Sequence, residues 1–362
     1  MSTTESKFDV YTADDLTGLE RRLHINTAIT LMINVLAVYC IFSYSTKSMN
    51  VYKWYLLIIQ LTTALFDFHL TVIFVPFPTF PIPGFCAAGI WSRHWDYLWG
   101  VVIPFILLHW FLCFQGMAII YGILYRYRVI TEKMEWMNAT WVRILMVIIP
   151  LIYPIPAAAF LITYIADKTI ILAFLRQNAP EMVELYSTES CSAAIYSTST
   201  ALYCLTAGTE ILIGFSVIIF YSYKTYAELM RKRPMMSEAT FKLQKQLLVA
   251  LFLQCAVPFF CLVIPIIALY VMVLLNFKKM KGKSESFDLS NILLLVASMI
   301  ALQIMTLHSS GNGILMIWTI KPYKEGVLKL FCSRCVRTST QPLKEITMIS
   351  SQIEITRNPR NS

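Results

Sequence analysis

The chain has 362 residues, of which 57% are apolar and only 14% are charged, and its mean hydropathy is +0.62. Soluble domains carry about 25% charged residues, so the composition excludes an ordinary soluble protein and indicates a chain whose solvent is lipid. The net charge of +9 does not indicate nucleic-acid binding, because the basic residues are spread over several short connections. We therefore expect the lipid bilayer, and no nucleic acid, among the partners.

Seven apolar runs of roughly 20 residues are long enough to cross a hydrocarbon core of about 30 Å as helices. We predict spans at about 24–45, 54–75, 98–121, 142–165, 200–223, 247–275 and 290–319. The second run stops at a proline-rich segment, PFPTFPIPG, which cannot continue a helix. Pro258 and Pro265 lie inside the sixth run and predict either kinks tolerated in lipid or switch hinges. The fold class is an all-α integral membrane protein.

Counting Lys and Arg on either side of the spans predicts how the chain is oriented. Twenty of the 30 basic residues lie on the side of the C-terminus, and the cytoplasmic side usually holds this excess. The outer loop 276–289 opposes this orientation with four lysines. The predicted parts are an extracellular segment 1–23, a seven-transmembrane bundle 24–319, an amphipathic membrane-surface helix 320–335 and a flexible cytoplasmic tail 336–362.

Two cysteines lie in predicted outer loops. Cys86 follows the proline-rich loop, and Cys191 lies late in the loop 166–199. On the oxidising side of a membrane a disulfide persists, so we expect these two residues to pair and to hold the long loop over the bundle mouth. The alternative is two unpaired cysteines.

Several polar side chains lie near the expected mid-depth of the spans. Such residues normally face the bundle interior and pair there, which makes them candidates for a ligand cavity or, equally, for structural hydrogen bonds between helices. The intramembrane polar residues are Asp67, His69 and His308. The candidate ligand-binding residues, chosen for depth and polarity, are His109, Tyr203, Glu210, Phe259 and Gln303.

Catalytic and metal-binding patterns are not found. The five histidines include no H-x-x-x-H pair, and no hydrolase elbow motif surrounds Ser309. We therefore expect no enzyme activity, no metal and no cofactor. A ligand-gated channel subunit or a small-molecule transporter is the alternative to a receptor, although the sequence shows no internal repeat typical of transporters.

The predicted cytoplasmic face is basic and ends in an amphipathic segment. Its basic residues can dock a protein partner or meet anionic lipid. Those expected to face a signalling partner are Arg126, Arg128, Arg231, Lys232, Arg233 and Lys242. After the last span, KPYKEGVLKLFCSRC predicts a helix lying on the inner leaflet. Cys332 and Cys335 are candidates for palmitoylation or, equally, ordinary reduced cysteines.

Four stretches resemble the nematode serpentine chemoreceptors, specifically the class H and class I branch of the Str superfamily. They are MNVYKWYLLIIQLTTALFDF (49–68), VPFPTFPIPGFCAAGI (75–90), FKLQKQLLVALFLQCAVPFFCLVIP (241–265) and LHSSGNGILMIWTIKPYKEGVLKLF (307–331). The resemblance covers nearly the whole chain. The third span ends in CFQGMAIIYGILYRYR, where the branch usually has an acidic-Asn-Arg-like element, so Arg126 or Arg128 is expected in its place.

This resemblance implies a seven-transmembrane bundle like that of G-protein-coupled receptors, with a short eighth helix. It also implies a chemosensory receptor that binds a small odorant or pheromone-like ligand and signals through a heterotrimeric G protein. The expected location is the plasma membrane, with the N-terminus outside, in the cilia of sensory neurons.

Overall fold

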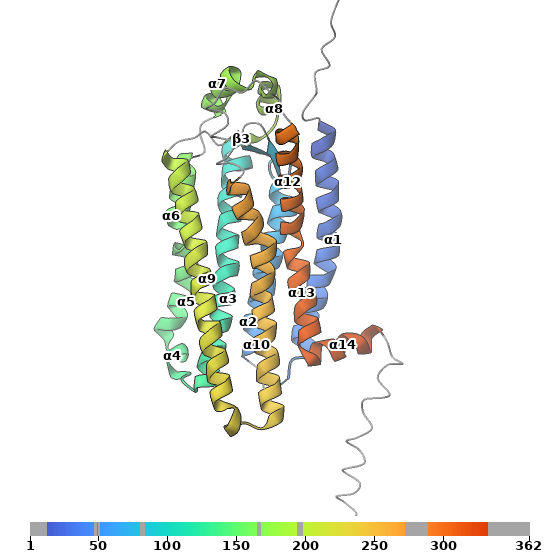
Figure 1. Cartoon of the computed structure of the whole chain (residues 1–362). Helices are drawn as coiled ribbons and strands as arrows, with labels where there is room; N and C mark the ends of the chain where they lie inside the picture. Colours follow the sequence, from blue (N-terminus) through green and yellow to red (C-terminus); the bar gives the residue numbers. More distant parts are fainter. Residues whose placement is uncertain are drawn as a thin grey trace, which may run out of the picture.

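The computed structural model describes residues 13–46, 49, 51–79, 84–164, 168–193, 198–271 and 289–331. Within these residues, seven helices are long and apolar enough to cross a membrane. They stand side by side in one upright bundle (Figure 1). The predicted fold class is confirmed.

The spans are built from one to three helical segments each. In chain order they are α1 (Ala13–Ser43); α2 (Tyr52–Phe68) with the π-helix η2 (His69–Phe74); the π-helix η3 (Leu98–Val102) with α3 (Ile103–Thr131); α5 (Thr140–Ile152) with α6 (Ile155–Tyr164); α9 (Thr198–Lys232); α10 (Glu238–Pro258) with the π-helix η6 (Phe259–Val263) and residues 264–271; and α12 (Leu289–Thr306) with α13 (His308–Thr319). The first helix begins well before residue 24, because hydropathy detects only the lipid-facing part of a helix whose backbone hydrogen bonds continue beyond it.

Breaks in the fourth and sixth spans coincide with proline. The fourth span turns at Tyr153 and Pro154, where proline supplies no backbone N–H. Pro258 ends α10, and η6 follows at once. A π turn contains one extra residue, so it changes which side chains face the bundle interior. The sixth span therefore departs from regular α-helix at Pro258, one of its two predicted prolines, by means of a π turn, whereas Pro265 lies within the helical residues 264–271.

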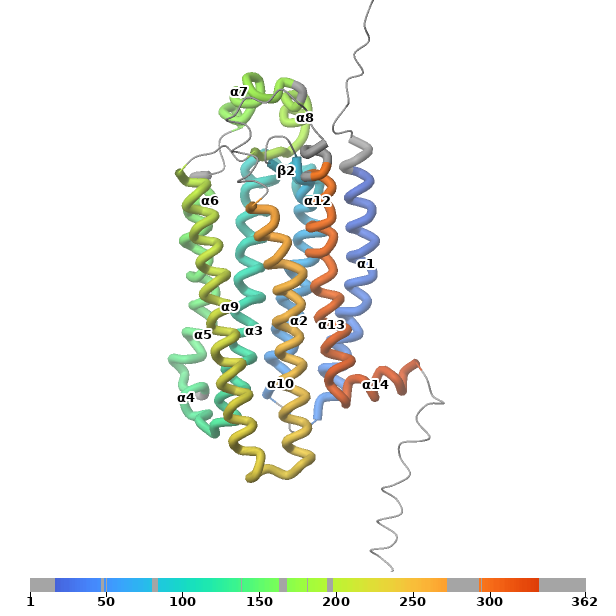
Figure 2. Tube along the Cα trace, viewed as in Figure 1, coloured from blue at the N-terminus to red at the C-terminus, as the bar shows by residue number. Residues whose placement is uncertain are grey.

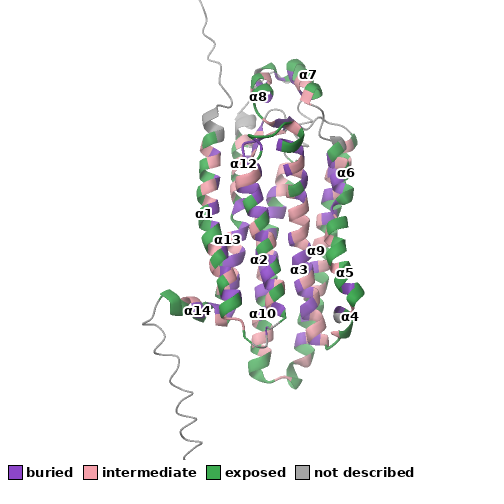
Figure 3. Ribbon diagram, turned by 180° about the vertical axis from the view of Figure 1, so that it is seen from behind, coloured by how far each residue is buried: buried purple, intermediate pink, exposed green. Residues whose placement is uncertain are grey.

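The outward faces of the spans are apolar and exposed. Val147 on α5 and Leu212 and Ile219 on α9 are 65–66% exposed, and exposed residues follow the outer faces of α1 and α5 (Figure 3). Apolar surface of this extent is stable only against lipid. These faces are therefore the lipid contact of the bundle.

A small antiparallel sheet covers one end of the bundle, where the sequence predicts only a loop. Its strands are β1 (Pro76–Thr79), β2 (Gly84–Ala87) and β3 (Cys191–Ala193), in the order β1-β2-β3. The prolines of β1 fit an edge strand, because proline cannot donate to a ladder on both sides. Above the sheet lie α7 (Lys168–Asn178), the 3-10 helix η4 (Pro180–Met182) and α8 (Val183–Thr188) (Figure 1). We call α7, η4 and α8 the cap, and this end of the bundle the capped end.

The hairpin closes tightly on the end of η2. Val75 adopts a left-handed conformation with φ 47°, which is strained for a β-branched residue, and its carbonyl accepts a hydrogen bond from the Ala88 amide at 3.0 Å. A side chain on Gly89 would overlap the carbonyl oxygen of Ile73. Glycine is therefore required for the close approach that seats the sheet on the helices.

The opposite end, which we call the basic end, carries α4 (Glu135–Asn138), the 3-10 helix η5 (Arg233–Met235) and α14 (Lys321–Phe331). Helices α9 and α10 meet there through η5, and α14 runs across the end of α13 (Figure 2). Gly326 of α14 packs directly against the ring of Tyr44. The predicted surface helix 320–335 thus has a helical part from Lys321 to Phe331. Both cysteines proposed for palmitoylation, Cys332 and Cys335, lie outside the described residues.

Candidate functional site

A cavity of about 230 Å³ lies under the capped end, between α2, α3, α9, residues 264–271 and α12. On α9 the lining side chains recur at helical spacing, with Tyr203, Ala207 and Ile211 on one face. The hairpin closes the cavity toward the cap. Its lining is mostly apolar: Phe66, Leu70, Phe74, Pro76, Pro78, Gly84, Phe85, Phe105, Leu108, His109, Leu112, Thr200, Tyr203, Cys204, Ala207, Ile211, Ile266, Leu269, Tyr270, Ser298, Leu302 and Met305.

The few polar groups of this cavity lie mainly on its α3 and α9 side. The Tyr270 hydroxyl donates to the Tyr203 hydroxyl at 3.3 Å. The ring of His109 lies 6.2 Å from that of Tyr203, centre to centre, in an edge-on arrangement. An apolar pocket with a few placed polar groups is the usual form of a small-molecule site.

A second, smaller cavity of about 80 Å³ lies deeper in the bundle. Tyr153, Glu210 and Pro258 are among its lining residues, and His109 lines both cavities. The Nε2 atom of His109 lies 3.0 Å from Oε2 of Glu210, and both side chains are buried. The Tyr153 hydroxyl donates to the backbone carbonyl of Glu210 at 2.6 Å. The His109–Glu210 pair therefore stands at the boundary between the two cavities.

Cys113 joins this pair, one helical turn beyond His109. Its Sγ atom lies 3.9 Å from His109 Nε2 and 4.0 Å from Glu210 Oε2. Cys113 is not among the residues predicted from the sequence. Its signal was the four-residue spacing from His109, which places both side chains on one helix face.

Two of the five predicted ligand residues lie at neither cavity. Phe259 begins the π turn, is 37% exposed and contacts Phe260, which is 61% exposed on the outer surface. Gln303 follows Leu302, which α12 presents to the larger cavity. One residue is about 100° around a helix, so Gln303 lies to one side. Of the other three predicted residues, His109 lines both cavities, Tyr203 lines the larger cavity and Glu210 lines the smaller one.

The three intramembrane polar residues are buried between helices. His69 Nε2 lies 2.8 Å from the Pro104 carbonyl and so links the second and third spans. His308 contacts the ring of Phe66 edge-on, and one carboxylate oxygen of Asp67 is buried without a hydrogen-bond partner. None of the three lines the larger cavity, so their positions favour the structural interpretation over direct ligand contact.

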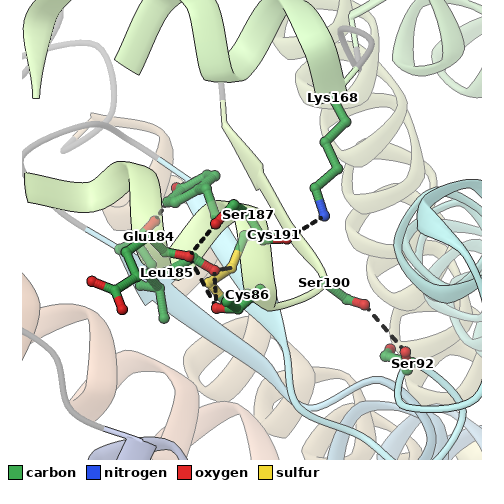
Figure 4. Close-up of a disulfide and its surroundings, with 11 residues drawn as sticks. Cys86, Ser92, Lys168, Glu184, Leu185, Ser187, Ser190 and Cys191 are labelled. Atoms are coloured by element: carbon green, nitrogen blue, oxygen red, sulfur yellow. Dashed lines mark hydrogen bonds between the residues drawn. A yellow bond between two sulfur atoms is a disulfide. The ribbon is translucent and has the colours of Figure 1, made fainter. Parts of the chain in front are cut away.

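A disulfide between Cys86 and Cys191 joins β2 to β3 (Figure 4). Two hydrogen bonds that fasten the cap lie around it. The Lys168 ammonium donates to the Ser187 carbonyl at 3.2 Å, and the Ser190 hydroxyl donates to the Ser92 carbonyl at 3.2 Å. The first bond links α7 to α8, and the second holds the segment between α8 and β3 against the turn that follows β2.

At the basic end, Arg126, which was predicted to face a signalling partner, is buried. It is only 3% exposed, its guanidinium donates to the backbone carbonyl of Gln244 at 3.1 Å, and it lies 4.9 Å from the centre of the Tyr52 ring. The side chain therefore faces inward and ties α3 to α10. Its length allows it to reach across the helix interface while packing on an aromatic face.

The other basic residues predicted to meet a partner lie nearer the surface. Arg128 packs over Trp136 at 4.8 Å, while Arg231, Arg233 and Lys242 are exposed. Lys232 Nζ lies 2.5 Å from the Glu132 carboxylate. A hydrogen bond from Lys232, together with its charge, lowers the pKa of Glu132 below its usual range. This pair joins the ends of α3 and α9.

The bundle, its apolar cavity and its disulfide-tied cap define a seven-transmembrane protein of the receptor type. The chain belongs to a nematode serpentine receptor family: the family model described as serpentine type 7TM GPCR chemoreceptor Srh matches residues 16–333. The match covers all seven spans and α14, which confirms the resemblance seen in the sequence. No curated protein matches the chain.

Proposed function

We propose that this chain is a G-protein-coupled chemosensory receptor whose ligand occupies the larger cavity. The observation that carries the proposal is the 230 Å³ space lined by five spans and the hairpin, in a member of a chemoreceptor family. Cavities between the helices of a bundle are common ligand sites. The ligand here contacts His109 and Tyr203, with Glu210 behind them.

The size and lining of the cavity indicate the chemistry of the ligand. An apolar cavity of about 150 Å³ holds benzene, so the larger cavity has room for roughly nine non-hydrogen atoms. The hydroxyls of Tyr203 and Tyr270 offer one polar contact. A small, mostly apolar odorant or pheromone-like molecule fits these dimensions.

The proposed orientation places the capped end outside and the basic end in the cytoplasm, in the plasma membrane of sensory cilia. Two thirds of the Lys and Arg residues lie on the C-terminal side, as the cytoplasmic side usually requires. The disulfide at the capped end suits the oxidising outer side.

Signalling would follow from a shift between two arrangements of the sixth span. Residues 264–271 contact the ligand cavity, and η6 separates them from α10, whose other end is held by Arg126. We call the arrangement without the Arg126–Gln244 hydrogen bond the open state. A ligand that binds better to this state shifts the equilibrium toward it. The exposed basic residues Arg231, Arg233 and Lys242 would then meet the heterotrimeric G protein.

The test uses cells that express the chain with a promiscuous G protein and a calcium reporter, exposed to small apolar odorants. Ala207→Phe fills the larger cavity and should abolish the response at unchanged surface expression. Leu212→Phe changes the lipid-facing side of the same helix, where Leu212 is 66% exposed, and should leave the response intact. Ligand-evoked conductance without any G-protein dependence would contradict the proposal and favour a channel.

A further inference from the structure

One cluster of metal-ligating side chains lies in the membrane interior. Among the described residues, His109, Cys113 and Glu210 are the one group of three or more His, Cys, Asp or Glu side chains whose ligand atoms converge, all within 4.8 Å of one another. His109 and Cys113 project from one face of α3 because they are four residues apart. Glu210 approaches from α9.

The cluster contains a polar atom that the protein does not satisfy. Glu210 is 9% exposed, and its Oε1 atom is buried without a hydrogen-bond partner, while Oε2 contacts His109. A carboxylate in the membrane interior is costly unless a partner balances its charge and its lone pairs. Glu210 is one of the residues that line the smaller cavity, and its unpartnered oxygen is available to a cation.

We infer that His109, Cys113 and Glu210 bind a zinc ion. With zinc–ligand bonds of about 2.0–2.3 Å, a tetrahedral site needs ligand atoms about 3.3–3.6 Å apart. The three distances here are 3.0, 3.9 and 4.0 Å, so shifts of a few tenths of an ångström complete the geometry. A thiolate and a carboxylate also cancel the charge of Zn²⁺, which leaves a neutral site in the lipid interior.

Three protein ligands leave the fourth zinc position open, as in zinc sites that bind an exogenous molecule. This position adjoins the cavities, because His109 lines both of them. A neutral nitrogen donor keeps the site uncharged, and nitrogen suits zinc. The ligand class is therefore a small amine that binds zinc as the free base. This step rests on the proposed function, whereas metal binding by the three side chains does not.

The first experiment titrates the purified full-length chain in detergent with Co²⁺, a spectroscopic substitute for Zn²⁺. Wild type should bind one ion that Zn²⁺ displaces, with a thiolate-to-cobalt absorption band. The affinity should rise with pH, because binding releases the thiol proton of Cys113 to the buffer. Absence of the band in folded wild-type protein would overturn the site.

Matched variants assign the band to the cluster. Cys113→Ser is nearly isosteric and removes only contacts of 3.9 and 4.0 Å, so it should fold normally, lose the band and bind at least about 100-fold more weakly. His109→Gln should do the same. Cys261→Ser, which replaces a free cysteine on η6 that lines neither cavity, is the control and should keep the band. Equal titrations of wild type and Cys113→Ser would overturn the inference.

The second experiment tests the open position with butylamine and with butanol, which has nearly the same shape but a weak donor. Butylamine should shift the visible cobalt bands, and butanol should not. No shift with butylamine, or equal amine binding after chelation of the metal, would overturn the open position. Neither experiment uses a G protein, so loss of signalling in cells and loss of metal binding are separate results.

Discussion

The contact between Arg126 and Gln244 predicts that Arg126→Met raises signalling in the absence of ligand. Methionine keeps much of the packing on Tyr52 but cannot donate to the Gln244 carbonyl, which lies 3.1 Å from the guanidinium. The two helices then lose a hydrogen bond that only the closed arrangement makes. The equilibrium should shift toward the arrangement in which the end of α10 has moved away.

The size of the shift follows from the chemistry of that bond. A hydrogen bond from a charged group contributes about 1.5–3 kcal/mol, and each 1.4 kcal/mol is a factor of about ten in an equilibrium constant. The Nε atom of Arg126 is buried without a partner, and this cost offsets part of the gain. We therefore expect the open state to rise about tenfold, near the lower end of that range.

The assay measures ligand-independent reporter activity per receptor at the cell surface, in cells that express a promiscuous G protein. Lys133→Met is the matched control, because it removes an exposed cationic side chain just after α3, and its basal activity should stay at the wild-type level. Unchanged basal activity in an Arg126→Met receptor that reaches the surface and responds to ligand would refute this prediction. An equal increase in Lys133→Met would refute it as well.

Three further predictions concern how the ends of the bundle are held. Cys86→Ser removes a cross-link over 105 residues, which stabilises a free chain by up to about 5 kcal/mol. The melting temperature should therefore fall, and a reducing agent should no longer change it. Because Lys232 lowers the pKa of Glu132, their contact stabilises the fold above the ordinary Glu pKa of about 4.3 and is lost only as pH falls through the lower folded-state pKa. Glu132→Gln should thus increase the rate of amide hydrogen exchange at the end of α9 at pH 7, and the difference in rate from wild type should vanish in acid. A difference in exchange rate that does not depend on pH would contradict this prediction. In Gly326→Ala the new methyl group overlaps the Tyr44 ring, and such overpacking costs about 1–3 kcal/mol of stability. Helix α14 should therefore become sensitive to protease, and a second substitution, Tyr44→Ala, should restore its resistance. Unchanged protease sensitivity in Gly326→Ala alone would count against the contact.

Hydropathy was sufficient to predict the seven spans, because each must satisfy its backbone hydrogen bonds inside lipid. The same signal could not predict the sheet at the capped end. The segment from Pro76 to Thr79 reads as a proline-rich loop although it pairs with β2, and the third strand begins at Cys191, more than a hundred residues beyond β2. Hydrogen bonds between distant segments leave no periodic pattern in either one.

Side-chain direction limited what could be predicted of the candidate site. Depth and polarity selected His109 and Tyr203, which line the larger cavity. They also selected Phe259, but the π turn that begins there changes which residues face inward, and a straight-helix pattern does not show this. Arg126 was expected to face a signalling partner because it lies at the end of the third span, where the family usually has an acidic-Asn-Arg-like element. Only the positions of Tyr52 and α10 show that its side chain is buried.

The disulfide has a consequence for proteolysis. The cap lies between Cys86 and Cys191 in the chain, so cleavage within α7 or α8 leaves one cysteine in each fragment. The two fragments stay covalently joined until a reducing agent is added, and each keeps its own membrane-spanning helices. A nicked molecule would therefore migrate as one species on a non-reducing gel and as two after reduction, which makes the cap a suitable place to insert a cleavage site without dispersing the bundle.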